Sequence, residues 1–144
     1  MRVLVVNGPN LNLLGTRRPD LYGTTTLGEL EARCRDWGRD LDLDVVCFQS
    51  NHEGAIVDRL HAARDDCAGV VINPGALTHT SYVLHDAIEA IALPTVEVHI
   101  SDIGAREEWR RVSVIRPVVV EAVTGEGIEG YRTALRRLAE HLGG

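Results

Sequence analysis

The chain has 144 residues, a size typical of one domain, so we expect residues 1–144 to form a single domain. Apolar residues make up 44% and charged residues 25%, and no apolar run approaches the roughly 18–20 residues of a membrane span. A net charge of −6 and a pI near 5.4 argue against general binding to nucleic acid or anionic membranes and favour a small-molecule partner.

Lysine is missing from the chain, because all fifteen Lys and Arg residues are arginines. This excludes lysine Schiff-base chemistry and a Walker-type phosphate loop. The three cysteines, Cys34, Cys47 and Cys67, have no CxxC spacing and lie in apolar patterns, so we expect buried free thiols. The apolar run over residues 1–6 is too short for a signal peptide, which favours a cytoplasmic location.

The first half of the chain alternates strand and helix. Residues 2–7 are a β-branched run that turn residues stop, which predicts a buried strand. Apolar residues between 27 and 41 recur at spacings of three and four and predict a helix, with Thr26 and Glu29 as its capping box. Residues 44–49 predict the next strand, and residues 50–53 can cap a second helix with an apolar stripe over 56–63.

The alternation continues to the end of the chain. The pattern predicts a strand over 69–73, a helix over 81–92, a strand over 95–99, a single helical turn at 106–110, a strand over 118–123 and a helix with an apolar stripe over 128–142. We therefore predict a flavodoxin-like, doubly wound α/β fold with a five-stranded parallel sheet and helices on both faces. No GxGxxG follows the first strand, which argues against a dinucleotide cofactor.

Amide and imidazole side chains gather where the predicted strands end. Asn10 follows the first strand, Asn73 ends the third with His79 after it, and His99 ends the fourth with Ser101 after it. Ligands of open α/β sheets bind beyond these carboxyl ends. Asn, Gly, Pro and Ser are also ordinary turn formers, which explains any single strand end equally well. Their coincidence at several ends favours a ligand site.

The connection from about residue 8 to residue 25 is far longer than the usual ~2–6 residues of a βα loop. It carries Arg17 and Tyr22 between Gly15 and Gly23, which can serve as hinges of a lid. A guanidinium close to Tyr22 would favour the ionised phenol and make it a general base. The alternative is a charged loop that is simply solvated.

Histidines 79, 85 and 99 raise the question of a metal site, since histidine is a common ligand of transition metals. HExxH spacing is missing, and Glu97 shares one strand face with His99, where it can orient His99 as a general acid. We therefore predict no metal. Asp86 lies in the first turns of a helix, where an acidic residue is favourable without any further role.

Four segments carry a close resemblance to the type II 3-dehydroquinate dehydratases, and the similarity spans nearly the whole chain. They are Asn7-Gly8-Pro9-Asn10-Leu11-Asn12-Leu13-Leu14-Gly15, Phe48-Gln49-Ser50-Asn51-His52-Glu53-Gly54, Asn73-Pro74-Gly75-Ala76-Leu77-Thr78-His79-Thr80-Ser81 and Glu97-Val98-His99-Ile100-Ser101. The segment Ala105-Arg106-Glu107-Glu108-Trp109-Arg110 extends the match. The resemblance implies reversible dehydration of 3-dehydroquinate to 3-dehydroshikimate through an enolate, without metal, cofactor or Schiff base.

The resemblance also implies residue roles. Tyr22 would remove the C2 proton, Arg17 would stabilise the tyrosinate, His99 would protonate the departing C1 hydroxyl, and Asn10 would hold a water beside the enolate oxygen. The implied substrate-binding residues are Asn73, His79, Asp86, Ile100, Ser101 and Arg110, with Glu97 supporting His99. The family usually assembles as a homododecamer built of trimers, and we expect that assembly here.

Several residues depart from the family pattern without touching the proposed reacting groups. Arg18 replaces an acid in the lid, which affects its charge, while Tyr82 and His85 change the surface near Asp86. Asp102 and Gly104 change the rim of the site. Two other functions stay open at this point: a non-catalytic module that binds a small anion, and a metal-dependent hydrolase that uses the histidines.

Overall fold

Five parallel strands form a single sheet in the computed structural model, which describes residues 1–16 and 18–143. The strands are β1 (Arg2–Asn7), β2 (Asp44–Gln49), β3 (Gly69–Asn73), β4 (Thr95–His99) and β5 (Glu121–Thr124), in the spatial order β2-β1-β3-β4-β5. This order belongs to the flavodoxin-like doubly wound class and confirms the predicted fold. The register aligns Asn7 with Gln49 on one side and with Asn73 on the other, so three amide side chains end adjacent strands.

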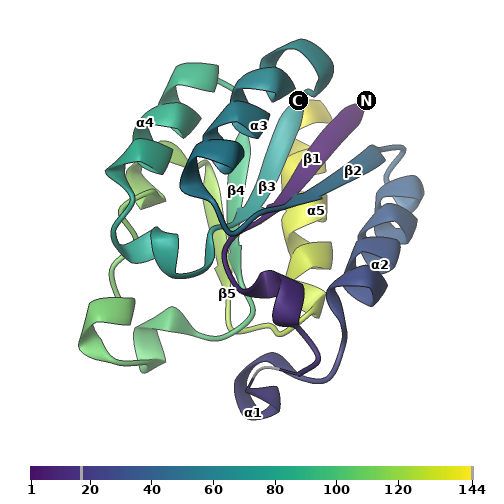
Figure 1. Ribbon diagram of the computed structural model, residues 1–144. Helices are drawn as coiled ribbons and strands as arrows, with labels where there is room; N and C mark the ends of the chain where they lie inside the picture. Colours follow the sequence, from purple (N-terminus) through teal and green to yellow (C-terminus); the bar gives the residue numbers. More distant parts are fainter. Residues whose placement is uncertain (17, 144) are drawn as a thin grey trace.

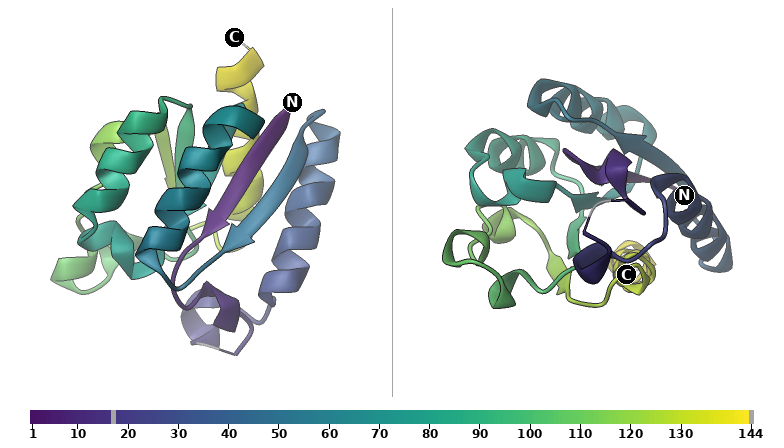
Figure 2. Two further views of the ribbon diagram at one scale, coloured as in Figure 1. Left: turned by 45° about the horizontal axis from the view of Figure 1, so that its top comes forward. Right: turned by 60° about the horizontal axis from the view of Figure 1, so that its bottom comes forward.

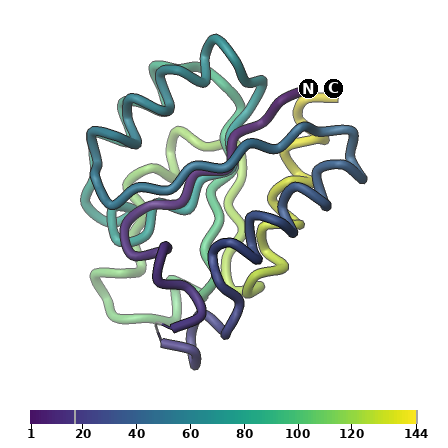
Figure 3. Tube along the Cα trace, turned by 45° about the vertical axis from the view of Figure 1, so that its right-hand side comes forward, coloured from purple at the N-terminus to yellow at the C-terminus, as the bar shows by residue number. Residues whose placement is uncertain are grey.

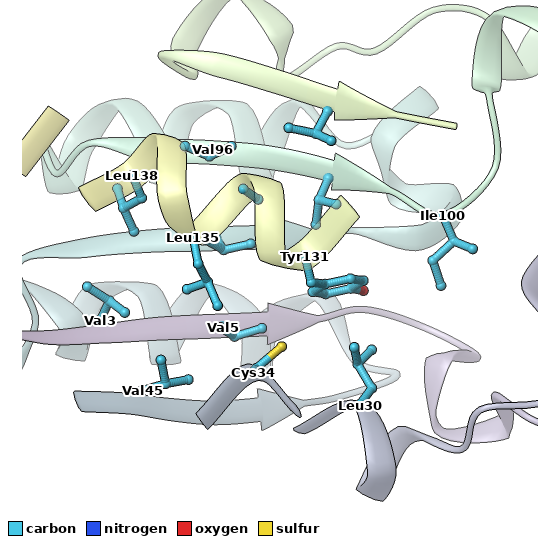
Figure 4. Packing of buried hydrophobic residues seen from close by; sticks show 14 of the residues in the cluster. Val3, Val5, Leu30, Cys34, Val45, Val96, Ile100, Tyr131, Leu135 and Leu138 are labelled. Carbon is cyan, nitrogen blue, oxygen red and sulfur yellow. The ribbon is translucent and has the colours of Figure 1, made fainter. Parts of the chain in front are cut away.

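Helices cover both faces of the sheet, as Figures 1 and 2 show. The helices α2 (Leu27–Asp40) and α5 (Glu129–Gly143) pack on one face, and α3 (Glu53–Asp66) and α4 (Tyr82–Ile91) pack on the other. Alternate residues of β1 supply both cores: Val3 and Val5 face α2 and α5, whereas Leu4 and Val6 face α3 and α4. Figure 4 shows the first of these cores, with Tyr131 and Leu135 of α5 over the sheet.

Helix boundaries follow local capping. Thr26 accepts a hydrogen bond from the Glu29 backbone while Glu29 accepts one from the Thr26 backbone, which confirms the predicted capping box of α2. Ser81 caps α4 by accepting from the Leu84 backbone at 3.0 Å. No helix within residues 1–16 and 18–143 is both long and apolar enough to cross a membrane.

The prediction for the fifth strand was wrong at its start, because β5 begins at Glu121 rather than at Val118. Residues Arg116–Val118 instead form the 3₁₀ helix η5, in which the Val118 backbone donates to Ile115 at 3.0 Å. Pro117 has no N–H for a sheet ladder and fits the first turn of a helix. The apolar run of valines therefore extends beyond the strand.

The long connection after β1 lies across the carboxyl end of the sheet (Figure 2, right). It contains the 3₁₀ helix η1 (Leu11–Leu13) and the short helix α1 (Pro19–Tyr22), which the sequence pattern did not predict. The two glycines predicted as hinges both have left-handed backbone angles, with φ of 92° at Gly15 and 75° at Gly23. The start of β1 and the end of α5 lie at the opposite end of the molecule (Figures 1 and 3).

Candidate active site

A pocket opens at the carboxyl ends of β1, β3 and β4, beside the point where the strand order reverses between β1 and β3. This is where ligands bind in doubly wound sheets. Its lining comes from the loops after these strands, from α1, and from the segment that holds the 3₁₀ helices η3 (Ile103–Ala105) and η4 (Glu108–Arg110). The lining residues are Pro9, Asn10, Leu11, Tyr22, Gly75, Ala76, His79, His99, Ile100, Ser101, Ile103, Arg106 and Arg110.

Tyr22 enters the pocket from the end of α1 and is only 9% exposed. The Arg106 Nη1 group donates a hydrogen bond of 2.9 Å to the Tyr22 hydroxyl, and the Arg106 guanidinium lies 5.8 Å from the centre of the Tyr22 ring. Arg106 also reaches the Ser101 hydroxyl at 3.4 Å. This contact joins α1 to the segment that follows β4 at the pocket.

The arginine that sequence analysis assigned to Tyr22 was Arg17, which lies outside the described residues. Arg106 was predicted to begin a short helical turn and lies in a segment that matches the family, but no role in the site was predicted for it. It lies 84 positions from Tyr22, and no periodic pattern connects two loops so far apart. One feature of the sequence could have pointed to Arg106. It lies five residues after Ser101, in the loop that follows the fourth predicted strand, whose end had been assigned to the site.

His99 and Glu97 form the second polar unit of the pocket. They are two positions apart on β4 and therefore share a face of the sheet, as predicted. The His99 Nε2 group lies 2.5 Å from Glu97 Oε2, and the two residues are 5% and 1% exposed. Glu97 Oε1 is buried without a hydrogen-bond partner in the described part of the chain. A buried carboxylate on one ring nitrogen fixes the orientation of the imidazole.

His79, Trp109 and Arg110 form a third cluster at the rim. The Val112 carbonyl accepts a hydrogen bond of 2.7 Å from His79 Nδ1, and since a carbonyl can only accept, the neutral ring carries its hydrogen there. The Trp109 ring packs edge-on against His79 at 5.5 Å, and the Arg110 guanidinium stacks over Trp109 at 4.0 Å. Arg110 Nε also donates to Glu107.

These contacts affect the ionisation of the rim. Burial lowers the pKa of His79. The Val112 carbonyl and Glu97 act in the opposite direction, and the neighbouring His99 and Arg110 add to the lowering. The Arg110 hydrogen bond lowers the pKa of Glu107. The rim therefore presents a neutral imidazole next to a fixed guanidinium.

Asn10 lines the pocket from a loop that the end of β2 holds in place. Its backbone is left-handed, with φ of 70°, a conformation that asparagine tolerates better than most residues. The Asn10 backbone donates to Asn51 Oδ1 at 2.9 Å, and Gln49 Nε2 donates to both Asn51 Oδ1 and the Gly8 carbonyl at 3.1 and 3.2 Å. The amides after β2 thus position the loop that carries Asn10.

The structure brings together seven of the predicted site residues as pocket lining: Tyr22, His99, Asn10, His79, Ile100, Ser101 and Arg110. Glu97 contacts His99 from behind, and its supporting role in a reaction stays a prediction. Asn73 is buried beneath the pocket and Asp86 is exposed on α4, where its carboxylate lies 2.9 Å from His85 Nδ1. Neither of these two is among the described residues that line the pocket.

The three histidines considered as metal ligands are not gathered at one point. His79 and His99 line the pocket, whereas His85 pairs with Asp86 on α4. Within the described residues, no group of three His, Cys, Asp or Glu side chains is arranged to hold a metal ion.

Fold and pocket together define a flavodoxin-like α/β protein with a polar pocket at the switch point of its sheet. The sequence profile of the family described as "Dehydroquinase class II" matches residues 1–139, so the chain belongs to that family, as its motifs predicted.

Individual proteins of the family are similar over almost their entire length. The 3-dehydroquinate dehydratase of Ruegeria pomeroyi is 54% identical over 97% of this chain and 94% of its own. The catabolic 3-dehydroquinase of Verticillium alfalfae is 50% identical over 98% of this chain and 94% of its own. Among solved structures, the type II dehydroquinase from Propionibacterium acnes superposes with a TM-score of 0.93, at 45% identity and 96% coverage of each chain.

Proposed function

We propose that this chain is a 3-dehydroquinate dehydratase, a lyase that converts 3-dehydroquinate to 3-dehydroshikimate and water. The names of its relatives support the substrate. The observation that carries the proposal is that two groups able to transfer protons, Tyr22 and His99, lie in one pocket. Each has its own charged neighbour: Arg106 bonds Tyr22, and Glu97 bonds His99. A dehydration needs these two functions, a base to remove a proton from carbon and an acid to protonate the leaving hydroxyl.

In the proposed reaction the Tyr22 phenolate removes the proton from C2 of the substrate, which leaves an enolate. Arg106 stabilises the phenolate by its hydrogen bond, and Arg17 has the same role by family resemblance. Asn10 holds a water beside the enolate oxygen, where preorganised donors act on developing charge.

His99 then donates a proton to the C1 hydroxyl, which departs as water while the C1–C2 double bond forms. Because Glu97 engages Nε2, Nδ1 is the ring nitrogen that transfers this proton. The cycle closes when Tyr22 releases the proton that it took from C2 to solvent and His99 takes up a proton from solvent. The proposed steps require neither a cofactor nor a Schiff base, and the sequence contains no lysine to form one.

Substrate binding is assigned to the rim and to the loop after β4. Arg110 binds the carboxylate, because a planar guanidinium can donate two parallel hydrogen bonds to it. His79, the backbone of Ile100 and the hydroxyl of Ser101 bind further oxygens of the substrate. A direct contact between Asn73 and the substrate stays a prediction, because Asn73 is buried beneath the pocket.

Asp86 is exposed on α4 and is not among the described residues that line the pocket, and we assign it to the pocket of a neighbouring copy in a homo-oligomer. Exposed apolar side chains near this part of α4 support such an assembly. From the family resemblance we expect it to be a dodecamer. These side chains are Tyr82, Val83, Trp109 and Val112, which are between 52% and 68% exposed. Light scattering on the eluted peak of a gel-filtration column tests the assembly.

The cellular role is proposed only in outline. We propose a cytoplasmic enzyme, and the relatives include both a 3-dehydroquinate dehydratase and a catabolic 3-dehydroquinase, so biosynthesis and breakdown are both open.

The test is an ultraviolet assay of the purified protein with 3-dehydroquinate. The product is a conjugated enone, so absorbance increases if the proposal holds. Circular dichroism must show that the protein is folded. Unchanged absorbance at high enzyme concentration with folded protein would refute the function.

A further inference from the structure

A buried hydroxyl connects the ends of two strands beneath the pocket. Tyr131, in the first turns of α5, accepts a hydrogen bond of 2.9 Å from Asn73 Nδ2 and donates one of 2.6 Å to Asn7 Oδ1. Tyr131 and Asn7 are fully buried, and Asn73 is 4% exposed. Figure 4 shows the Tyr131 ring lying over the sheet with its oxygen directed along the strands, toward their carboxyl ends.

The hydroxyl is well suited to this position. Burial raises the pKa of Tyr131, so the phenol keeps its hydrogen and can donate to one amide while it accepts from the other. A phenylalanine ring would fill the same space but leave Asn73 Nδ2 and Asn7 Oδ1 without this partner. Buried polar atoms are rarely left unpaired, since each such atom destabilises the arrangement that buries it.

Asn73 holds the backbone of both loops, the one that follows β1 and the one that follows β3. The Asn73 carbonyl accepts from the Gly8 backbone at 2.8 Å, and Asn73 Oδ1 accepts from the Gly75 backbone at 3.2 Å. The loops also touch directly: a Cβ on Gly8 would lie 2.5 Å from the Pro74 carbonyl oxygen, and one on Gly75 would lie 2.9 Å from that of Pro9. A displacement of Asn73 is therefore transmitted to both loops.

These loops carry Asn10 and His79 into the pocket. We propose that Tyr131 is a positioning residue that fixes the loops 8–10 and 74–79 and so sets the placement of Asn10 and His79. The catalytic part of this inference rests on the proposed function. Tyr131 itself does not line the pocket, and it acts through the loops. Misplacement of catalytic groups by about 1 Å can lower a rate by about 100-fold.

The test compares Tyr131→Phe with the unchanged protein. We expect a folded variant whose kcat falls by about 10- to 100-fold while its KM changes less than its kcat. Thr133→Val is the matched control, because it removes another hydroxyl of α5, one that bonds Glu126 at 2.7 Å on the surface. That variant should keep the kcat of the unchanged protein.

A double variant separates positioning from loss of stability. Asn7 Nδ2 has no partner among the described residues, so Asn7→Leu removes that orphan atom together with the acceptor that Tyr131→Phe leaves unpaired. We expect Asn7→Leu/Tyr131→Phe to regain thermal stability relative to Tyr131→Phe without regaining kcat. If kcat returns together with stability, Tyr131 is merely structural and the inference is overturned.

Hydrogen exchange provides a readout that does not depend on the reaction. The amides of Gly8 and Gly75 should exchange at least 10-fold faster in Tyr131→Phe than in the unchanged protein, while amides of β2 should not. Unchanged exchange in both loops overturns the inference whether or not the protein dehydrates 3-dehydroquinate. Faster exchange in a protein without dehydratase activity would instead refute the proposed function and leave the positioning role intact.

Discussion

The Tyr22 hydroxyl and the Arg106 guanidinium meet at 2.9 Å although they lie 84 positions apart in the chain. Tyr22 comes from the connection after β1 and Arg106 from the connection after β4, so this contact joins two loops across the mouth of the pocket. Tyr22 also packs into the core beneath the pocket, so the contact ties the segment that carries Arg106 to a side chain that the core already holds in place.

Tyr22→Phe removes the proposed base and leaves the ring. We expect kcat to fall by about 1,000-fold or more, in the range that loss of general base catalysis produces. Binding of 3-dehydroshikimate, measured by calorimetry, should change only a few-fold because the carboxylate contact of Arg110 is kept. Activity close to that of the unchanged protein would eliminate Tyr22 as the base.

Arg106 can be tested by a graded pair of substitutions. Arg106→Ala should lower kcat by about 100- to 1,000-fold, the usual effect of removing one donor at a centre of developing charge. Arg106→Lys should lower kcat less than Arg106→Ala does, because lysine keeps the positive charge but loses the planar fork of the guanidinium. Millimolar guanidinium should restore part of the activity of Arg106→Ala. Equal kcat values for Lys and Ala, with no restoration, would contradict the role.

Most of the framework was predictable because it follows from local patterns. Apolar runs and helical spacing predicted five strands and four long helices, and alternation in a short chain predicted the doubly wound sheet. The start of β5 was misplaced because a run of valines looks alike in a strand and in the turn that precedes it. The single domain stays a prediction.

The site was predictable to the extent that strand ends define it. Asn10, His79 and His99 could be located because each follows or ends a predicted strand. Arg106 could not, because its partner is set by how two irregular loops close. Tyr131 lies in the apolar stripe that was predicted for the last helix, and its ring does lie in the core. The hydrogen bonds of its hydroxyl could not be predicted, because their partners Asn7 and Asn73 come near only when α5 packs over β1 and β3.

The lowered pKa of His79 predicts a pH effect with a definite sign. A histidine whose pKa is lower in the folded than in the unfolded state contributes stability above its ordinary pKa of about 6.5 and loses it as the pH falls. His79→Asn keeps a donor near the Val112 carbonyl and does not titrate. Urea unfolding should therefore show a smaller advantage of the unchanged protein over His79→Asn at pH 5 than at pH 8. If the unchanged protein exceeds His79→Asn in stability by more at pH 5 than at pH 8, the prediction is wrong.

The thiols should react slowly in the folded protein. Burial raises the pKa of Cys47 and of Cys67 to about 11, and it also raises the pKa of Cys34. Against an ordinary thiol pKa near 8.5, we expect alkylation by iodoacetamide at pH 8 to be about 100-fold slower or more for each thiol. Mass spectrometry of timed samples measures the rates, with urea-unfolded protein as the control. A folded thiol that reacts as fast as an unfolded one would contradict the prediction.

Gly8→Ala tests the close approach of the two loops beneath the pocket. A Cβ at residue 8 would lie 2.5 Å from the Pro74 carbonyl oxygen, and because both partners are backbone, neither can rotate away. We expect the free energy of unfolding to fall by about 1–3 kcal/mol, as in other overpacked sites. Gly54→Ala is the matched control, since Gly54 lies in α3 with open space around its Cβ position and should gain about 0.5–1 kcal/mol. Urea unfolding measures both changes. If Gly8→Ala is as stable as Gly54→Ala, the loops can separate without loss, and their contact does not fix the pocket.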